Sequence, residues 1–205
     1  MTSSNAYHEG NRLLQDRFDT RRIADRLEER NSRDVFNDAD RAFITSRDMF
    51  FLATADEHGV PQCSYKGGDP GFVTVVDETT LAFPDYNGNG TFLSLGNVLR
   101  NAHVGLLFID FTKPNRLRVN GIASITDADP LLESSPDAQL IVRVQVQQVR
   151  SNCPRYVHTM EPVERSPYVP RPDRDAPIPD WKRRAAYNDA LPLHDPALGA
   201  ELLPE

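Results

Sequence analysis

Cysteine is scarce in this sequence, so disulfide bonds cannot be the main source of stability of the fold. Its 205 residues include two cysteines, Cys63 and Cys153, and neither lies in a Cys/His cluster with the spacing of zinc ligands. A disulfide framework and a structural zinc site are therefore excluded, although a single bridge between the two thiols stays open. A chain of this length can bury a sufficient hydrophobic core without either.

Positive charge and long apolar runs are also scarce. The chain carries 23 Lys and Arg against 30 Asp and Glu, a net charge of -7, which argues against a general nucleic-acid or anionic-membrane binder. No run approaches the roughly 20 apolar residues that span a bilayer, and the N-terminal MTSSNAYHEGNR has no apolar secretory core. We therefore expect a cytoplasmic protein.

The first region, residues 1–47, predicts a helical extension. Apolar residues recur among charges at near-helical intervals and are expected to pack on a core made elsewhere. They are Leu13, Phe18, Ile23 and Leu27. Asn37 or Asp40 is expected to cap a second short helix, which leads into the main domain.

The second region, residues 48–150, predicts an antiparallel barrel. Short β-rich runs are separated by turn residues, and in the last run Val142, Val144 and Val146 alternate with polar residues, which indicates one buried face. A helix is expected at residues 92–99. Consecutive short strands with one embedded helix fit a closed or nearly closed barrel better than a βαβ sheet. The expected strands span residues 50–54, 60–65, 72–76, 80–83, 103–109, 117–125 and 141–149.

The third region, residues 151–205, is rich in proline and charge. Its prolines are spaced too closely for a helix interior and predict an extended tail. A disordered tail is one interpretation of this composition. Tyr156, Tyr168 and Trp181 favour the other, in which the tail docks on the barrel or at a dimer interface.

The segment CSYKGGDPGF, residues 63–72, carries the densest functional signal. Ser64 and Lys66 are two apart on an expected strand, so their side chains share one face while Tyr65 points to the other. Glycines from Gly67 onward allow a ligand to approach the backbone closely. The segment predicts an anion-binding edge, although an ordinary glycine turn with a solvated lysine also fits it.

Two further segments carry weaker signals. FPDYNGNGTFLSLGN, residues 83–97, places small polar side chains where a strand leads into a helix, an arrangement that can receive a phosphate. It lacks the glycine patterns of Rossmann and P-loop proteins. In NRLRVNG, residues 115–121, Arg116 and Arg118 share one strand face and suit a phosphate or a flavin carbonyl. A plain turn and a solvated strand face are the alternatives.

Four segments carry a combined signal in chain order, namely FFLATADEHGVPQCSYKGGDPGF, TLAFPDYNGNGTFLSLGN, NAHVGLLFIDF and RLRVNGIASI. Together they resemble the pyridoxamine 5'-phosphate oxidase-like FMN-binding split-barrel family. The GG-x-PGF turn, the SLGN segment, the N-terminal YHEGNRLLQDRFDTRRIADRL and the later NCPRYV resemble one branch of that family. The resemblance therefore covers nearly the whole chain.

The resemblance implies a mainly β fold with flanking helices, an antiparallel split β-barrel of the FMN-binding type. It implies a homodimer with FMN at the subunit interface, and an oxidoreductase that moves hydride or electrons between NAD(P)H or a small organic substrate and an acceptor such as oxygen. No catalytic residue is identified. The candidate cofactor-binding residues are Ser64, Tyr65, Lys66, Gly67, Phe83, Asn87, Asn89, Ser94, Asn97, Arg116 and Arg118.

The sequence departs from the family pattern at the phosphate-binding helix. The family's oxidases usually have an Arg-Lys pair there, whereas this chain has Leu93-Ser94, and it lacks the basic pocket pattern for pyridoxine phosphate. Vitamin B6 oxidation is therefore not expected. Three alternatives stay open: a non-catalytic flavin-binding sensor or storage protein, a haem-binding split barrel with His158 as ligand, and a deazaflavin-binding protein.

Replacing Lys66 with Ala is expected to weaken flavin binding by about 1.5–3 kcal/mol, because a charge-assisted contact with the ligand would be lost. Titration of the purified variant with FMN measures the change. An unchanged dissociation constant would place Lys66 in solvent.

Overall fold

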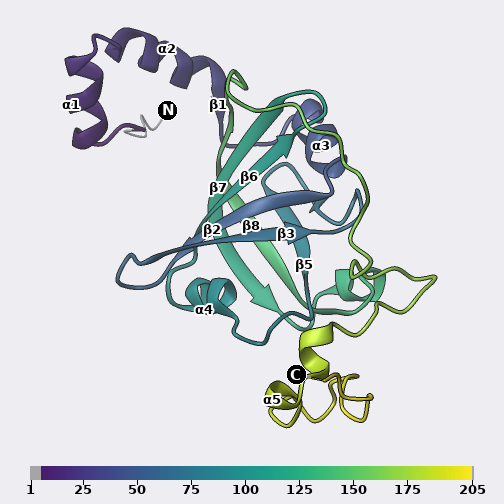
Figure 1. The fold of residues 1–205 in the computed structure, drawn as a ribbon. Helices are drawn as coiled ribbons and strands as arrows, with labels where there is room; N and C mark the ends of the chain where they lie inside the picture. The colour runs from purple at the N-terminus through teal and green to yellow at the C-terminus, as the bar shows by residue number, and fades with distance from the viewer. Residues whose placement is uncertain (1–5, 205) are drawn as a thin grey trace. The chain divides into compact units, whose positions relative to one another are not determined.

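An eight-stranded antiparallel sheet is the centre of the structure (Figure 1), a computed structural model that describes residues 6–204. The strands are hydrogen-bonded in the order β3-β2-β6-β7-β8-β5-β4, and β1 pairs with β8. The strands are β1 Ser32–Arg33, β2 Met49–Ala55, β3 Pro61–Gly67, β4 Thr74–Val75, β5 Thr80–Tyr86, β6 His103–Asp110, β7 Asn115–Thr126 and β8 Ala138–Ser151. The α-helices are α1 Glu9–Arg17, α2 Arg21–Asn31, α3 Asp38–Thr45, α4 Leu93–Arg100 and α5 Ala185–Asn188, and the 3-10 helices are η1 Pro130–Ser134 and η2 Asp180–Arg183.

Alternation along the strands decides which side chains form the core. In β2, Phe50, Leu52 and Thr54 are buried, while the residues between them are not. In β8, Val144 and Val146 are buried and the polar residue between them is exposed, as predicted. Full burial of an aliphatic or aromatic side chain contributes about 1.5–3 kcal/mol, so this period of two fixes which face of β2 and of β8 turns inward.

The sheet does not close on itself. β3 and β4 are the two ends of its hydrogen-bonded order, and β4 pairs only with Leu81 and Ala82 of β5. We call the gap between β3 and β5 the seam. The predicted fold, mainly β with flanking helices, is therefore confirmed, and the barrel is split along this seam rather than closed by hydrogen bonds.

Both residues predicted to cap a helix before the main domain take part in the cap of α3. The Asn37 side chain accepts a hydrogen bond from the Asp40 amide at 2.9 Å, and the Asp40 carboxylate accepts one from the Asn37 amide at 3.0 Å. This reciprocal pair is a capping box. Arg33 also donates to the Asp40 carboxylate at 2.8 Å, which ties β1 to α3.

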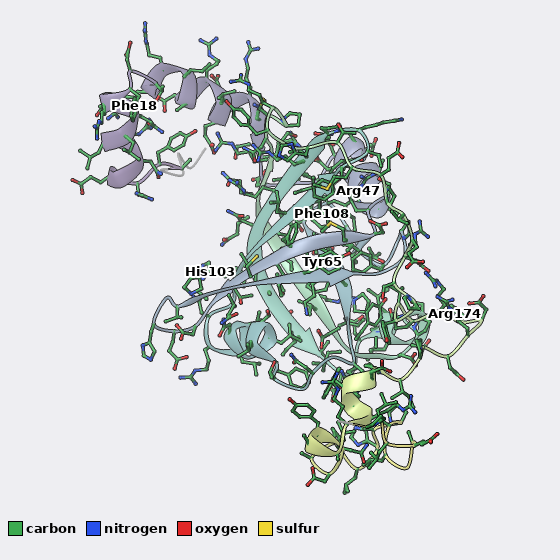
Figure 2. The ribbon with its side chains drawn as sticks, viewed as in Figure 1. Phe18, Arg47, Tyr65, His103, Phe108 and Arg174 are labelled. Carbon is green, nitrogen blue, oxygen red and sulfur yellow. The ribbon has the colours of Figure 1, made fainter. Side chains whose placement is uncertain are left out.

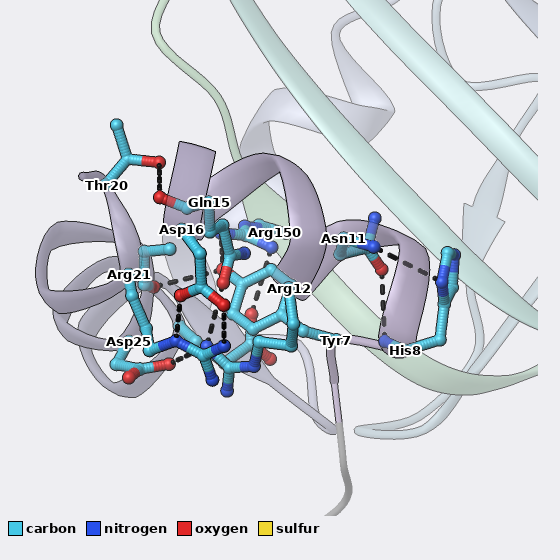
Figure 3. A network of polar contacts seen from close by, with 12 residues as sticks. Tyr7, His8, Asn11, Arg12, Gln15, Asp16, Thr20, Arg21, Asp25 and Arg150 are labelled. Atoms are coloured by element: carbon cyan, nitrogen blue, oxygen red, sulfur yellow. Dashed lines mark hydrogen bonds and ion pairs between the residues drawn. The ribbon is translucent and has the colours of Figure 1, made fainter. Parts of the chain in front are cut away.

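Polar contacts hold the two N-terminal helices to the sheet (Figure 3). The Tyr7 hydroxyl donates to the carbonyl of Ala24 in α2 and accepts a hydrogen bond from Arg150 in β8, each at 3.0 Å. Arg150 also pairs with Glu28 of α2 at 2.9 Å. The Arg12 guanidinium of α1 lies 4.8 Å from the centroid of the same tyrosine ring. Tyr7 therefore links α1, α2 and β8.

The apolar residues of these two helices do not pack on the core, and that prediction is wrong for this chain. Neither α1 nor α2 buries a residue, and Phe18 is 67% exposed (Figure 2). Leu13, Ile23 and Leu27 are exposed as well. Helical spacing identifies residues that share a face, but it does not show what covers that face.

Among residues 6–204, every helix is too short or too polar to span a bilayer.

The described residues fall into two compact units, divided between Pro162 and Val163. The second unit is not wholly extended, since it contains η2 and α5. Within it, Lys182 and Asp195 form an ion pair at 2.7 Å, and both side chains are buried. The docking of this tail on the barrel or at a dimer interface stays a prediction.

Gly121 of β7 is expected not to tolerate a side chain. The pairing with β8 shifts register beside it, and an added Cβ would overlap the carbonyl oxygen of Gln145, a backbone atom that cannot easily move aside. Gly121→Ala should lower the free energy of unfolding by about 3 kcal/mol, the upper range of overpacking effects, as measured by denaturant titration. Gly105→Ala in β6 is the matched control, because the nearest atom to its Cβ would be 3.5 Å away. Equal losses in the two variants would contradict the prediction.

Candidate functional site

The predicted residues of β3 lie on two faces. Lys66 is opposite the buried Phe50 of β2, and Ser64 is opposite the buried Leu52. Directly opposed residues of antiparallel strands project to the same side, so Ser64 and Lys66 turn toward the barrel interior, which we call the inner face. Tyr65 projects from the outer face and is 63% exposed (Figure 2). These orientations agree with the alternation in the sequence.

The structure brings Ser64 to the start of α4. The Ser94 hydroxyl donates to the Ser64 hydroxyl at 3.1 Å, and Ser94 is buried. No side chain caps this helix, because the N-cap residue is Phe92, whose backbone is left-handed with φ 47°. The first amides of a helix have no acceptor within the helix. This end of α4 therefore offers N–H donors beside two hydroxyl groups.

Asn97 holds α4 onto β2. Its Nδ2 donates to the hydroxyl oxygen of the buried Thr54 at 3.1 Å. Leu95 and Val98, on the same helix, are buried in the core. Asn97 thus positions the helix whose start carries Ser94.

Lys66 is joined by Asp85 of β5, which was not among the predicted cofactor-binding residues. The Lys66 ammonium donates to the Asp85 carboxylate at 3.2 Å across the seam. Asp85 follows Leu81 and Phe83 on the inner face of β5, and all three residues are buried. The available signal in the sequence was the placement of Asp85 two positions after Phe83 and four after Leu81, on the face expected to be buried. An acidic residue at such a position needs a counter-ion.

Of four other predicted residues, three have structural roles within the chain and the fourth lies in an exposed loop. Phe83 is 1% exposed and packs in the core, so it presents no surface to a ligand in this chain. Gly67 ends β3 and leaves the space into which the Tyr65 ring extends. The Asn89 side chain accepts hydrogen bonds from the amide and the hydroxyl of Thr91, at 3.1 and 2.6 Å. Asn87 is exposed in the loop that precedes α4.

Arg116 and Arg118 lie on the outer face of β7. Their neighbours Leu117 and Val119 are buried on the inner side. Arg118 is exposed, whereas Arg116 is half-buried and its buried Nε has no hydrogen-bond partner within the described structure. In one copy of the chain, these arginines and Ser64 therefore occupy opposite faces of the sheet.

Burial and nearby carboxylates raise the pKa of the tyrosines that stand next to Lys66 and Asp85 in the sequence. Burial raises the pKa of Tyr86, which follows Asp85, and the nearby Asp69 carboxylate raises it further. Burial likewise raises the pKa of Tyr65, to which Asp48 adds. Both phenols are therefore neutral at neutral pH.

This donor set suits a phosphate group such as that of FMN. The hydroxyls of Ser64 and Ser94, the amides at the start of α4 and the Lys66 ammonium can all donate to phosphate oxygens. A Cβ added at Gly96, in the first turn, would meet no atom within 4 Å, so that side of the turn is open. His158, the predicted haem ligand, is exposed. Residues 6–204 contain no group of three or more His, Cys, Asp or Glu able to hold a metal ion.

The sequence profile described as pyridoxamine 5'-phosphate oxidase matches residues 36–164, a span that contains every strand from β2 to β8. No curated protein matches the chain. Three solved structures resemble it in part. HupZ of Group A Streptococcus is 17% identical over 58% of this chain and 98% of its own, with a TM-score of 0.46. The heme storage protein HutZ of Vibrio cholerae is 19% identical over 54% of this chain and 90% of its own, with a TM-score of 0.41. An FMN-binding protein of Syntrophomonas wolfei is 12% identical over 69% of this chain and 97% of its own, with a TM-score of 0.43.

Asn97→Ala should destabilise the protein by about 1–3 kcal/mol, because the buried Thr54 hydroxyl would lose its partner. Adding Thr54→Val should recover part of that loss, since replacing both partners leaves no unsatisfied group. Denaturant unfolding of the two single variants and the double variant measures the coupling. Strictly additive losses would show that this hydrogen bond does not hold α4 in place.

Proposed function

Because more than half of its residues match the family profile, the chain belongs to the pyridoxamine 5'-phosphate oxidase family, and on that premise we propose that it is an FMN-dependent oxidoreductase. It acts as a homodimer in the cytoplasm, with no nucleic-acid or membrane partner. It passes hydride or electrons between NAD(P)H or a small organic substrate and an acceptor such as oxygen.

The observation that carries this proposal is the Ser64–Ser94 hydrogen bond at the uncapped start of α4. The two hydroxyls and the helix amides hold the phosphate, and the helix dipole favours its negative charge. Arg116 supplies a donor toward the flavin N1 and O2 edge, where negative charge develops on reduction. When bound, FMN supplies the hydride and electron transfer, which no side chain of the protein provides.

In this proposal, Arg116 and Arg118 reach the flavin from a second copy of the chain. They share no face with Ser64 in one copy, so a ligand that meets both sets must lie between two copies. Exposed apolar side chains are also present for such an interface, among them Tyr65 and Leu99. Their burial on association is favourable.

A phosphorylated vitamin B6 substrate is not part of the proposal. The start of α4 has Leu93-Ser94 where the family's oxidases carry two basic residues. Lys66 is already paired with Asp85. A second phosphate beside that of FMN would therefore meet too little positive charge.

Native mass spectrometry of unheated protein tests cofactor and dimer together. We expect a dimer with one FMN per subunit, and a yellow protein that oxidises NAD(P)H or an organic substrate. A colourless protein that ignores added FMN would overturn the proposal. Release of haem or a deazaflavin would show that the protein binds that cofactor instead of FMN. Bound FMN without turnover would show a flavin-binding sensor or storage protein instead of an oxidoreductase.

Two binding-deficient variants test whether two copies share one site. Ser94→Asp places a negative charge at the phosphate, and Arg116→Ala removes the arginine, so each homodimer should lose FMN. After co-expression, half of the dimers are mixed, and each has one site built from two unaltered halves. About a quarter of all sites should then regain FMN, which follows from the two-fold symmetry. No recovery would show that one copy supplies the whole site.

A further inference from the structure

Asp85 is a buried carboxylate beside the proposed phosphate site. Its Oδ1 lies 3.2 Å from Lys66 Nζ, and the two side chains are 9% and 23% exposed. We propose that Asp85 determines ligand specificity: by cancelling the charge of Lys66, it limits the preference of the site for a phosphate-bearing ligand over the phosphate-free form. This inference rests on the proposed function, in which flavin phosphate binds beside Ser64 and Ser94.

The fold explains why Asp85 faces Lys66. Both residues project to the inner face. Asp85 is two positions after the buried Phe83 on β5, and Lys66 is opposite the buried Phe50 of β2. β4 pairs with β5 only as far as Ala82, so at Asp85 the side of β5 away from β8 is not covered by β4. The ion pair therefore crosses the seam where backbone pairing has ended, and its low exposure keeps salt from screening it strongly.

The pair leaves the phosphate site without net charge. The first turn of α4, residues 93–96, carries no charged side chain. Lys66 is two residues from Ser64 on the same strand face, which places their backbones about 7 Å apart. Because Asp85 offsets this ammonium, a phosphate at Ser64 meets hydroxyl and amide dipoles rather than a full positive charge. Loss of the carboxylate charge would leave Lys66 unopposed.

FMN and riboflavin differ only in the phosphate, so the ratio of their dissociation constants measures this preference. We expect Asp85→Asn to shift the ratio about tenfold toward FMN, the effect of one unit charge at this range in a partly solvated site. Asp85→Glu keeps the charge and should keep the ratio of the unaltered protein. General destabilisation would weaken both flavins alike and leave the ratio unchanged.

Asp129→Asn is the matched control. Asp129 is another buried carboxylate, paired with Arg143, and its loss should leave the flavin ratio unchanged. If Asp85→Asn does not fold, Asp85→Ser removes the same charge with a smaller side chain and should shift the ratio in the same direction. An unchanged ratio in the neutral variant that folds would overturn the inference.

The proposed function can fail separately. If the unaltered protein binds neither flavin, that function is wrong, and inorganic phosphate then serves as the probe. Phosphate should raise the Tm of Asp85→Asn more than that of the unaltered protein. Equal shifts would overturn the inference about Asp85 as well.

Discussion

The packing of aromatic rings around Phe50 is the constraint on which the rest of the structure depends. Phe50 is fully buried, and its ring centroid lies 4.9 Å from that of Phe83 in β5 and 5.1 Å from that of Phe108 in β6. Each such contact adds about 0.5–1.5 kcal/mol beyond the burial of apolar area. Because hydrogen bonds do not close the sheet, these rings bring β2 and β5 together across the interior. Lys66 of β3, the strand paired with β2, and Asp85 of β5 meet across the seam as a consequence.

Local patterns in the sequence were sufficient for most of the fold. The period of two correctly predicted that Ser64 and Lys66 of β3 share one face, with Tyr65 on the other, and that Val144 of β8 lies on a buried face. The cap of α3 at Asn37 could be predicted because a capping box involves residues only three apart. Strand identity and helix caps depend on interactions between near neighbours in the chain. For that reason, strand identity and helix caps can be predicted from a single sequence.

The features that the sequence did not reveal depend on distant residues. Ser64 and Ser94 are 30 positions apart, and Lys66 and Asp85 are 19 apart, so their contacts follow from tertiary packing rather than from spacing. The separation of Arg116 from Ser64 likewise depends on how β3, β2, β6 and β7 are joined. The helical spacing in α1 and α2 was correct, yet nothing in it showed that Phe18 would be exposed.

The division of the site between two faces connects binding with assembly. On the inner face the charges of Lys66 and Asp85 cancel, so that face contributes shape and dipoles. On the outer face, Arg116 keeps a buried Nε without a hydrogen-bond partner in the described chain, and a ligand oxygen there would remove the free-energy cost of that unsatisfied donor. Under the proposed function, uncompensated positive charge reaches the flavin from the second copy. Ligand binding and dimerisation would then be linked, and each would strengthen the other by the same factor.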